Sequence, residues 1–231
     1  MSYKTKSKVI FDLDHTLYNY DLAHKIAINE ALSFLRKMTG CSEEKILMTF
    51  NSARKNTHIE LANTASSHNR LLYFQKTLEG LNRNALELAL PCYETYWGTF
   101  LNNMILFKGV ISLLEMLKSQ GREICILTDL TTHIQMRKIN ALELTNYVDF
   151  MVSSEEAGKE KPHSIMFYKA LDKLKGTKEQ AVMIGDNWEK DILGAYSFGI
   201  QGIWLNHKRE KKEMPPGITE IFHFEELLNI L

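Results

Sequence analysis

The chain has few of the features that mark disulfide-rich, zinc-binding or nucleic-acid-binding proteins. Its 231 residues include three cysteines without CxxC spacing, which argues against a disulfide framework or a zinc site. The 28 basic and 28 acidic side chains give a formal net charge of zero. The one short basic stretch, residues 208–212, is no clustered positive surface, so we expect no primary role in binding nucleic acid.

Long apolar runs and paired histidines are missing too. The apolar segment that follows the lysines near the N-terminus is too short for the core of a signal peptide, and Asp12 interrupts it. The eight histidines are scattered without an HxH or HExxH pair, so they indicate no metal site. The length suffices for a sizeable core. We expect a cytoplasmic globular protein without membrane attachment.

The apolar pattern divides the chain into two regions. From about residue 21 to 104, apolar residues recur at spacings of three and four, which is typical of helices. After Met104, short strand-like apolar runs alternate with helical patterns, which predicts a parallel sheet covered on both faces. We therefore predict an α/β fold, with a Rossmann-like parallel-sheet core (residues 1–20 and 105–231) and an inserted helical cap domain (21–104). Expected helices include 110–119, 131–144 and one after Glu189.

Asp12 and Asp14 follow the first apolar run, Val9–Phe11. Alternate residues of a strand point to the same side, so we expect both carboxylates to face one site. A hard divalent cation such as Mg²⁺ would relieve their repulsion. The alternative is a strand that ends in a polar turn, with the aspartates serving as helix caps.

Further polar residues follow later strands. Thr128 ends the second apolar run, Lys161 precedes a proline and an expected helix, and Asp186 and Asp191 follow the run that ends at Gly185. Because ligands bind at the carboxyl ends of strands in open parallel sheets, we expect these side chains to converge with the first acidic pair. Taken singly, each could be structural: Thr128 and Asp191 as helix caps, and Lys161 as a surface lysine.

The four segments together resemble the haloacid dehalogenase (HAD) superfamily. Its motifs DxDxT, a strand-terminal Thr or Ser, a Lys and GDxxxD are matched by Asp12/Asp14/Thr16, Thr128, Lys161 and Gly185-Asp186 with Asp191. The resemblance runs from Val9 to about Leu205. Within the superfamily, the sequence is similar to the branch that contains nucleotidases and N-acylneuraminate phosphate phosphatases. Two positions depart from the usual pattern: Lys108 stands where many relatives have proline, and Asp129-Leu130 replaces the common Asn-Gly.

The resemblance implies a Mg²⁺-dependent phosphomonoesterase of small phosphorylated metabolites that acts through an aspartyl-phosphate. Asp12 would be the nucleophile and Asp14 the general acid and then base. Thr128 would hold a phosphoryl oxygen, and Lys161 would offset its charge. The metal ligands would be Asp12, the backbone carbonyl of Asp14, Asp186 and, directly or through one water, Asp191. The helical cap would close over the site and select the substrate.

Other functions fit less well. In haloacid dehalogenases the first motif resembles DxYxT, with a tyrosine at the position of Asp14. Asp14 therefore argues against dehalogenation. A phosphomutase shares all four motifs and stays an alternative, whereas the motif order disfavours a phospho-accepting signalling receiver. The sequence does not determine the substrate, the oligomeric state, or the roles of His15, Tyr18, Tyr20 and Trp188. It also does not determine which cap residues contact an anionic substrate group. The candidates are Arg54, Lys55, His58, Asn69 and Arg70.

Overall fold

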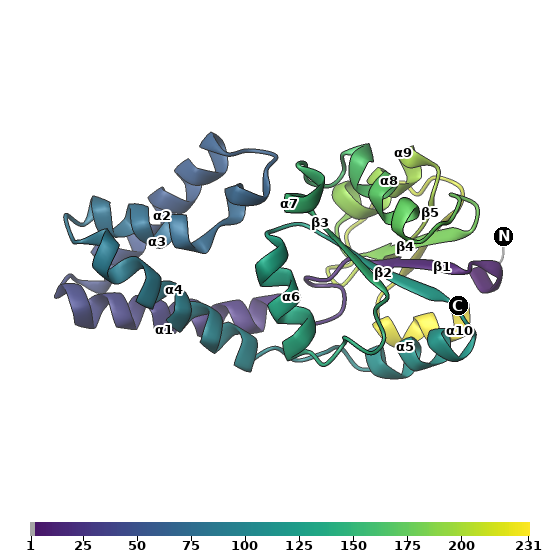
Figure 1. The fold of residues 1–231 in the computed structure, drawn as a ribbon, viewed down its shortest axis with the longest axis horizontal. Coiled ribbons are helices and arrows are strands. Elements are labelled where there is room, and N and C mark those ends of the chain that lie inside the picture. The colour runs from purple at the N-terminus through teal and green to yellow at the C-terminus, as the bar shows by residue number, and fades with distance from the viewer. Residues whose placement is uncertain (1–2) are drawn as a thin grey trace. The chain divides into compact units, whose positions relative to one another are not determined.

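A six-stranded, all-parallel sheet forms the centre of the larger of two compact units (Figure 1). The computed structural model describes residues 3–231. The strand order is β3-β2-β1-β4-β5-β6. Strands β1 to β3 are added outward on one side of the sheet and β4 to β6 outward on the other, so the direction in which strands are added changes between β1 and β4. A parallel sheet was predicted and is confirmed. The strands are β1 (Lys8–Phe11), β2 (Glu123–Thr128), β3 (Phe150–Ser153), β4 (Ala181–Gly185), β5 (Gln201–Leu205) and β6 (Ile218–Ile221).

Helices cover both faces of this sheet because its strands alternate apolar side chains between the two faces. Ile10 packs in a cluster with Phe167 of α8, whereas the Phe11 ring lies 6.2 Å from the Phe224 ring near the C-terminus. In Figure 1, α8 and α9 lie above the sheet and α5 and α10 below it. The helices of this unit are α5 (Val110–Ser119), α6 (Thr132–Ala141), α7 (Ser154–Ala157), α8 (Ser164–Lys173), α9 (Gly194–Phe198) and α10 (Leu227–Ile230).

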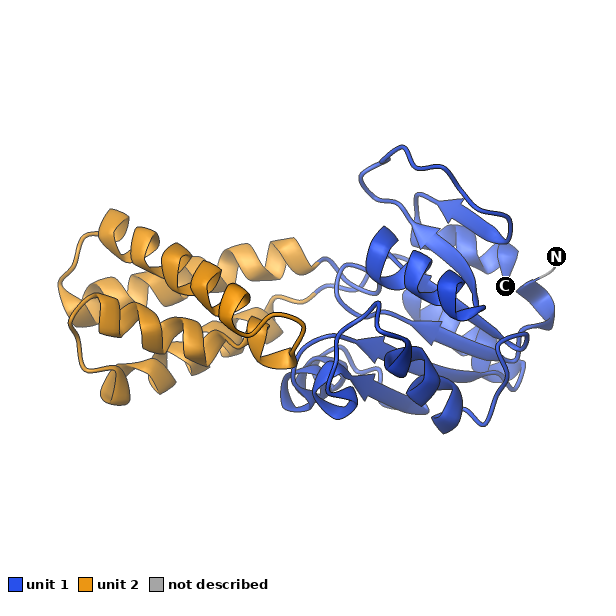
Figure 2. Ribbon diagram, turned by 90° about the horizontal axis from the view of Figure 1, so that it is seen from above, with its two compact units in different colours: residues 1–19, 105–231 blue, residues 20–104 orange. Residues whose placement is uncertain are grey.

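The second unit, residues 20–104, is a bundle of helices (Figure 2). Its core is aromatic, with Phe74 and Trp97 almost fully buried. Side-chain caps begin three of its helices: Ser42 accepts from the backbone N–H of Lys45, Asn69 from that of Leu71, and Asn84 from that of Glu87. The unit begins one residue before the start expected from the sequence. Its helices are α1 (Tyr20–Thr39), α2 (Glu43–Glu60), α3 (Arg70–Gly80) and α4 (Ala85–Asn102).

The helix expected after Glu189 is present, and it begins as a π-helical turn before it continues as α9. Residues Trp188–Leu193 form a π-helical turn, in which the backbone N–H of Ile192 donates to the carbonyl of Asn187, five residues earlier. The wide turn brings Asp191 against Gly185, where an added Cβ would lie 2.5 Å from the Cβ of Asp191. Only glycine at position 185 therefore permits this approach.

Candidate active site

The polar residues predicted to converge do so at the carboxyl edge of the sheet. Asp12 directly follows β1, Thr128 is the last residue of β2, and Asp186 directly follows β4. Lys161 comes from the loop between α7 and α8. The site therefore lies where the chain reverses its direction across the sheet, which is the position that ligands favour in open α/β sheets.

Three of the expected ligands form an acidic triad. Carboxylate oxygens of Asp12, Asp186 and Asp191 all lie within 4.8 Å of one another. The Lys161 ammonium lies 2.5 Å from Asp12 Oδ1 and 2.8 Å from Asp191 Oδ1, and it donates to the backbone carbonyl of Leu127 at 2.9 Å. Lys161 is only 3 % exposed, which rules out a surface lysine. With all three carboxylates ionised, the single ammonium of Lys161 therefore leaves two negative charges without a counter-charge.

The electrostatics of the triad fit a hard cation. Burial raises the pKa of Asp12 to about 7, although Lys161 acts in the opposite direction, and the neighbouring charges of Asp191 and Asp14 add to the rise. Burial and the charges of Asp12 and Asp191 raise the pKa of Asp186 to about 8. Asp191 Oδ1 is buried, and the Lys161 ammonium is its neighbour at 2.8 Å. A divalent oxygen-binding cation would stabilise the ionised form of such closely spaced, buried carboxylates.

Both oxygens of Asp12 are held by neighbouring groups. Lys161 Nζ donates to Oδ1 at 2.5 Å, and the Thr16 hydroxyl donates to Oδ2 at 3.0 Å. The same Thr16 hydroxyl accepts from the backbone N–H of Asp186 at 3.2 Å. Thr16, the third residue of the DxDxT motif, therefore fixes the orientation of Asp12 relative to the loop after β4.

The Asp14 side chain is not part of the triad. Its two carboxylate oxygens lie 2.7 and 2.8 Å from the ammonium of Lys138, which is fully buried on α6. The Tyr18 hydroxyl also donates to Asp14. Burial acts to raise the pKa of Asp14, but Lys138 and these hydrogen bonds outweigh it, so the pKa lies below its ordinary value. The idea that both aspartate side chains face one cation is therefore wrong, because Asp14 has its own buried lysine.

Lys138 and Gln135 are the site residues that the sequence reasoning missed. Gln135 Nε2 donates to the carbonyl of Asp129 at 2.8 Å, to the Thr128 hydroxyl, and more weakly to Asp14 Oδ2 at 3.3 Å. The available signal was two polar residues three positions apart among apolar ones on the helix after Thr128, since such residues share one face. Both are fully buried.

The departure at Asp129 has a structural explanation. Its Oδ1 accepts from the backbone N–H of Lys161 at 3.0 Å, and its Oδ2 pairs with Lys190 at 2.7 Å. Lys190 lies in the π-helical turn that also carries Asp191. The negative charge that Asp brings in place of Asn is therefore balanced, and the pair ties together the loops after β2 and β4 and the loop that carries Lys161.

Thr128 and the residues of undetermined role can also be placed. The Thr128 hydroxyl donates to the carbonyl of Asp129 at 3.2 Å, and no side chain caps α6, so Thr128 is no helix cap. Trp188 packs on Trp204, with ring centroids 4.7 Å apart in a small apolar cluster. His15 has a positive φ of 64° in the turn after Asp14, and its carbonyl accepts from His207. The contact with Trp204 gives Trp188 a packing role.

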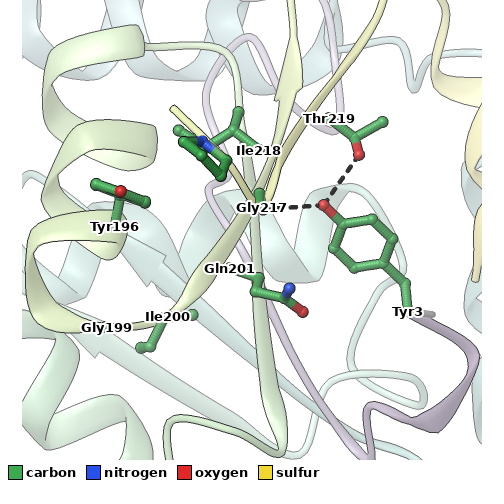
Figure 3. Close-up of a pocket in the computed structure, with 9 residues that line it drawn as sticks. Tyr3, Tyr196, Gly199, Ile200, Gln201, Gly217, Ile218 and Thr219 are labelled. Atoms are coloured by element: carbon green, nitrogen blue, oxygen red, sulfur yellow. Dashed lines mark hydrogen bonds between the residues drawn. The ribbon is translucent and has the colours of Figure 1, made fainter. Parts of the chain in front are cut away.

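A separate groove of about 480 Å³ lies at the opposite edge of the sheet, near the amino ends of β5 and β6 (Figure 3). The Tyr3 hydroxyl there donates to Thr219 Oγ1 at 3.0 Å and faces the carbonyl of Gly217 at 3.2 Å. The lining contains no lysine, arginine or acidic side chain. It therefore lacks the charges that phosphate chemistry needs.

The whole pattern matches one known family. The family model of the haloacid dehalogenase-like hydrolases matches residues 9–205. The chain belongs to this family. This HAD-like hydrolase is 37% identical to a ribulose-1,5-bisphosphate 5-phosphatase of Halopiger xanaduensis, over 87% of this chain and 85% of that one. It is 27% identical to the pyrimidine 5'-nucleotidase PynA of Streptococcus pneumoniae, over 96% and 94% of the two chains. The predicted family and the nucleotidase-containing branch are thereby confirmed.

Solved structures agree on the fold. A 2-haloacid dehalogenase from Pseudomonas syringae superposes on this HAD-like hydrolase with a TM-score of 0.80 at 23% identity, covering 97% of each chain. At that identity the likeness supports the fold alone. Within residues 3–231, no helix has the length and apolar character needed to span a membrane.

Proposed function

We propose that this HAD-like hydrolase is a Mg²⁺-dependent, cytoplasmic phosphomonoesterase of small phosphorylated metabolites, a sugar phosphatase or nucleotidase. The observation that carries the proposal is the arrangement of Asp12, a buried carboxylate held on one oxygen by Lys161 and on the other by Thr16, beside two further carboxylates. The names of the two relatives, a bisphosphate phosphatase and a nucleotidase, support the same reaction class.

In the first half-reaction, a carboxylate oxygen of Asp12 attacks phosphorus while the bond from phosphorus to the leaving oxygen breaks. Thr128 and Lys161 hold and offset the charge of the phosphoryl oxygens. Mg²⁺, held by Asp12, Asp186, Asp191 and the backbone carbonyl of Asp14, would supply the further positive charge that a phosphate dianion needs beside carboxylates. Asp14 protonates the leaving oxygen, and for this it must first take up a proton, because its pair with Lys138 favours the carboxylate form.

In the second half-reaction, water attacks the aspartyl-phosphate. Asp14 accepts the proton of that water, phosphate leaves, and the Asp12 carboxylate is restored. The pair between Asp14 and Lys138 gives Lys138 the role of a positioning residue, because it fixes where the Asp14 carboxylate points. A phosphomutase would use the same first half-reaction and would return the phosphoryl group to the substrate.

A screen of phosphorylated metabolites with and without Mg²⁺ tests the proposal. We expect free phosphate to be released from at least one sugar phosphate or nucleotide, and only with the metal. Conversion of a phosphate ester into its isomer without free phosphate would identify a phosphomutase instead. An absence of both products across sugar phosphates, nucleotides and p-nitrophenyl phosphate would overturn the proposed function.

Asp14→Asn is expected to affect substrates according to their leaving groups. An aryl phosphate departs with little protonation, so its transfer to Asp12 should slow less than that of an alkyl phosphate. Hydrolysis of the aspartyl-phosphate still needs a base, so a burst of aryl alcohol followed by slow turnover should appear in a stopped-flow assay. Equal slowing of both substrates, with no trapped phosphoenzyme, would show that Asp14 is not the acid and base.

Lys138→Met should reproduce part of this pattern if Lys138 positions Asp14. We expect kcat for an alkyl phosphate to fall by about ten- to a hundredfold, which is part of the roughly hundred- to ten-thousandfold that general acid–base catalysis contributes, and kcat for an aryl phosphate to fall less. Lys108→Met is the matched control, since that lysine is 85% exposed. Thermal unfolding checks that the variant folds. A uniform loss across leaving groups would assign Lys138 a purely structural role.

A further inference from the structure

One strongly charged side chain of the helical unit, Arg70, is surrounded by aromatic rings. Its Cζ lies 5.4 Å from the ring centroid of Tyr73 and 5.9 Å from that of Tyr96. Its Nη1 donates to the backbone carbonyl of His68 at 2.6 Å, and its Nη2 donates to the Tyr20 hydroxyl. Both Tyr73 and Tyr96 are almost completely buried. Arg70 itself is half-buried, so its guanidinium is partly withdrawn from water.

The partners of Arg70 are neutral. In the part of the chain that the structure describes, no carboxylate forms an ion pair with it, and its hydrogen bonds go to a backbone carbonyl and to the hydroxyls of Tyr20 and Tyr96. The buried lysines of the other unit differ, since Lys138 and Lys161 each lie within 2.8 Å of an aspartate oxygen. A cation that is partly desolvated without a counter-charge is costly, and binding an anion would offset that cost.

Two histidines contact the same tyrosines as Arg70, and a second arginine lies near one of these tyrosines. His58 Nε2 lies 2.7 Å from the Tyr73 hydroxyl, and His24 Nδ1 lies 2.8 Å from the Tyr96 hydroxyl. Burial raises the pKa of Tyr73, while the positive charges of Arg70 and Arg54 act to lower it, so a second arginine is electrostatically close. We call Tyr20, His24, His58, Arg70, Tyr73 and Tyr96 the Arg70 cluster.

We propose that the Arg70 cluster is a binding site for an anionic oxygen group, a phosphate or a carboxylate, of a small metabolite. The planar guanidinium offers five N–H donors in a fork that matches such groups, and the neutral partners in the structure occupy only part of them. The anion has two possible sources, which share this chemistry. It is either a second anionic group on the substrate, an assignment that rests on the proposed function, or a separate small anion.

The first arm of the test measures the anion alone. Metal-free protein is titrated calorimetrically with inorganic sulfate, since the acidic triad without metal repels an anion. Wild-type protein and Arg36→Gln, whose arginine is 65% exposed in the same unit, should bind sulfate, and Arg70→Gln should bind it at least tenfold more weakly. Equal binding by all three proteins, or binding by none, overturns the proposal.

The second arm identifies the source. Ribulose 1,5-bisphosphate carries two phosphates, whereas p-nitrophenyl phosphate carries one. A KM that rises about tenfold or more in Arg70→Gln for the bisphosphate alone assigns the site to the substrate. Unchanged KM values combined with lost sulfate binding assign it to a separate anion. If wild-type protein hydrolyses no phosphate ester, the proposed function fails, and the sulfate titration still decides the anion site.

A folding defect in Arg70→Gln would not end the test. Arg70→Lys keeps the positive charge but loses the paired N–H groups, so sulfate binding should weaken several-fold. Thermal unfolding establishes which of the two variants is folded at the assay temperature. Unchanged sulfate binding by folded Arg70→Lys and folded Arg70→Gln would overturn the proposal.

Discussion

Asp12→Asn should lower kcat by on the order of a thousandfold or more while the fold stays intact, because the amide cannot form the aspartyl-phosphate. The amide oxygen of an asparagine can still accept from Lys161, and its amide nitrogen can donate to the Thr16 hydroxyl, so the surrounding loops should keep their arrangement. The measurement is steady-state phosphate release from an aryl phosphate, together with thermal unfolding of the variant.

Asp172→Asn is the matched control, since Asp172 is an exposed aspartate on α8. It should leave kcat unchanged. Trapping of a covalent phosphoenzyme in wild-type protein, but not in Asp12→Asn, would locate the phosphoryl group directly. Comparable turnover in Asp12→Asn and wild-type protein would move the nucleophile to another residue.

Removal of divalent metal should abolish phosphatase activity, and added Mg²⁺ should restore it. The three close carboxylates of Asp12, Asp186 and Asp191 would otherwise repel a phosphate dianion. The experiment measures turnover after treatment with EDTA, followed by exchange into metal-free buffer and titration with Mg²⁺. Full turnover after rigorous metal removal would contradict the proposed mechanism.

Metal binding should also appear in stability, independently of turnover. The folded-state pKa of Asp12 is about 7 and that of Asp186 about 8, both above their ordinary value of 3.8. The metal-free folded protein therefore retains protons that the unfolded chain releases, so its stability should fall as pH rises from about 4 to about 8. Mg²⁺ should raise the unfolding temperature most at the upper end of this range. A metal-free unfolding temperature that does not fall across this range would contradict these pKa directions.

The sequence by itself determined the sheet and the position of the acidic site. Strands of a parallel sheet are buried on both faces and therefore apolar throughout. The runs that end at Phe11, Leu127 and Ile184 could be recognised because polar segments flank them. The residues after such runs must lie at one edge of the sheet. This is why Asp12, Thr128 and Asp186 could be grouped although they are far apart in the chain, whereas Lys161 follows no strand and was added to them through the family motif.

Only the tertiary structure decided which charges pair. Asp14 follows Asp12 by two residues, yet its side chain meets Lys138, which is 124 residues away. Backbone periodicity fixes the face on which a strand residue lies, but both aspartates follow the last residue of β1, where that alternation no longer holds. Pairing there depends on where α6 packs and on which buried cation needs a carboxylate, and neither is a local property of the sequence.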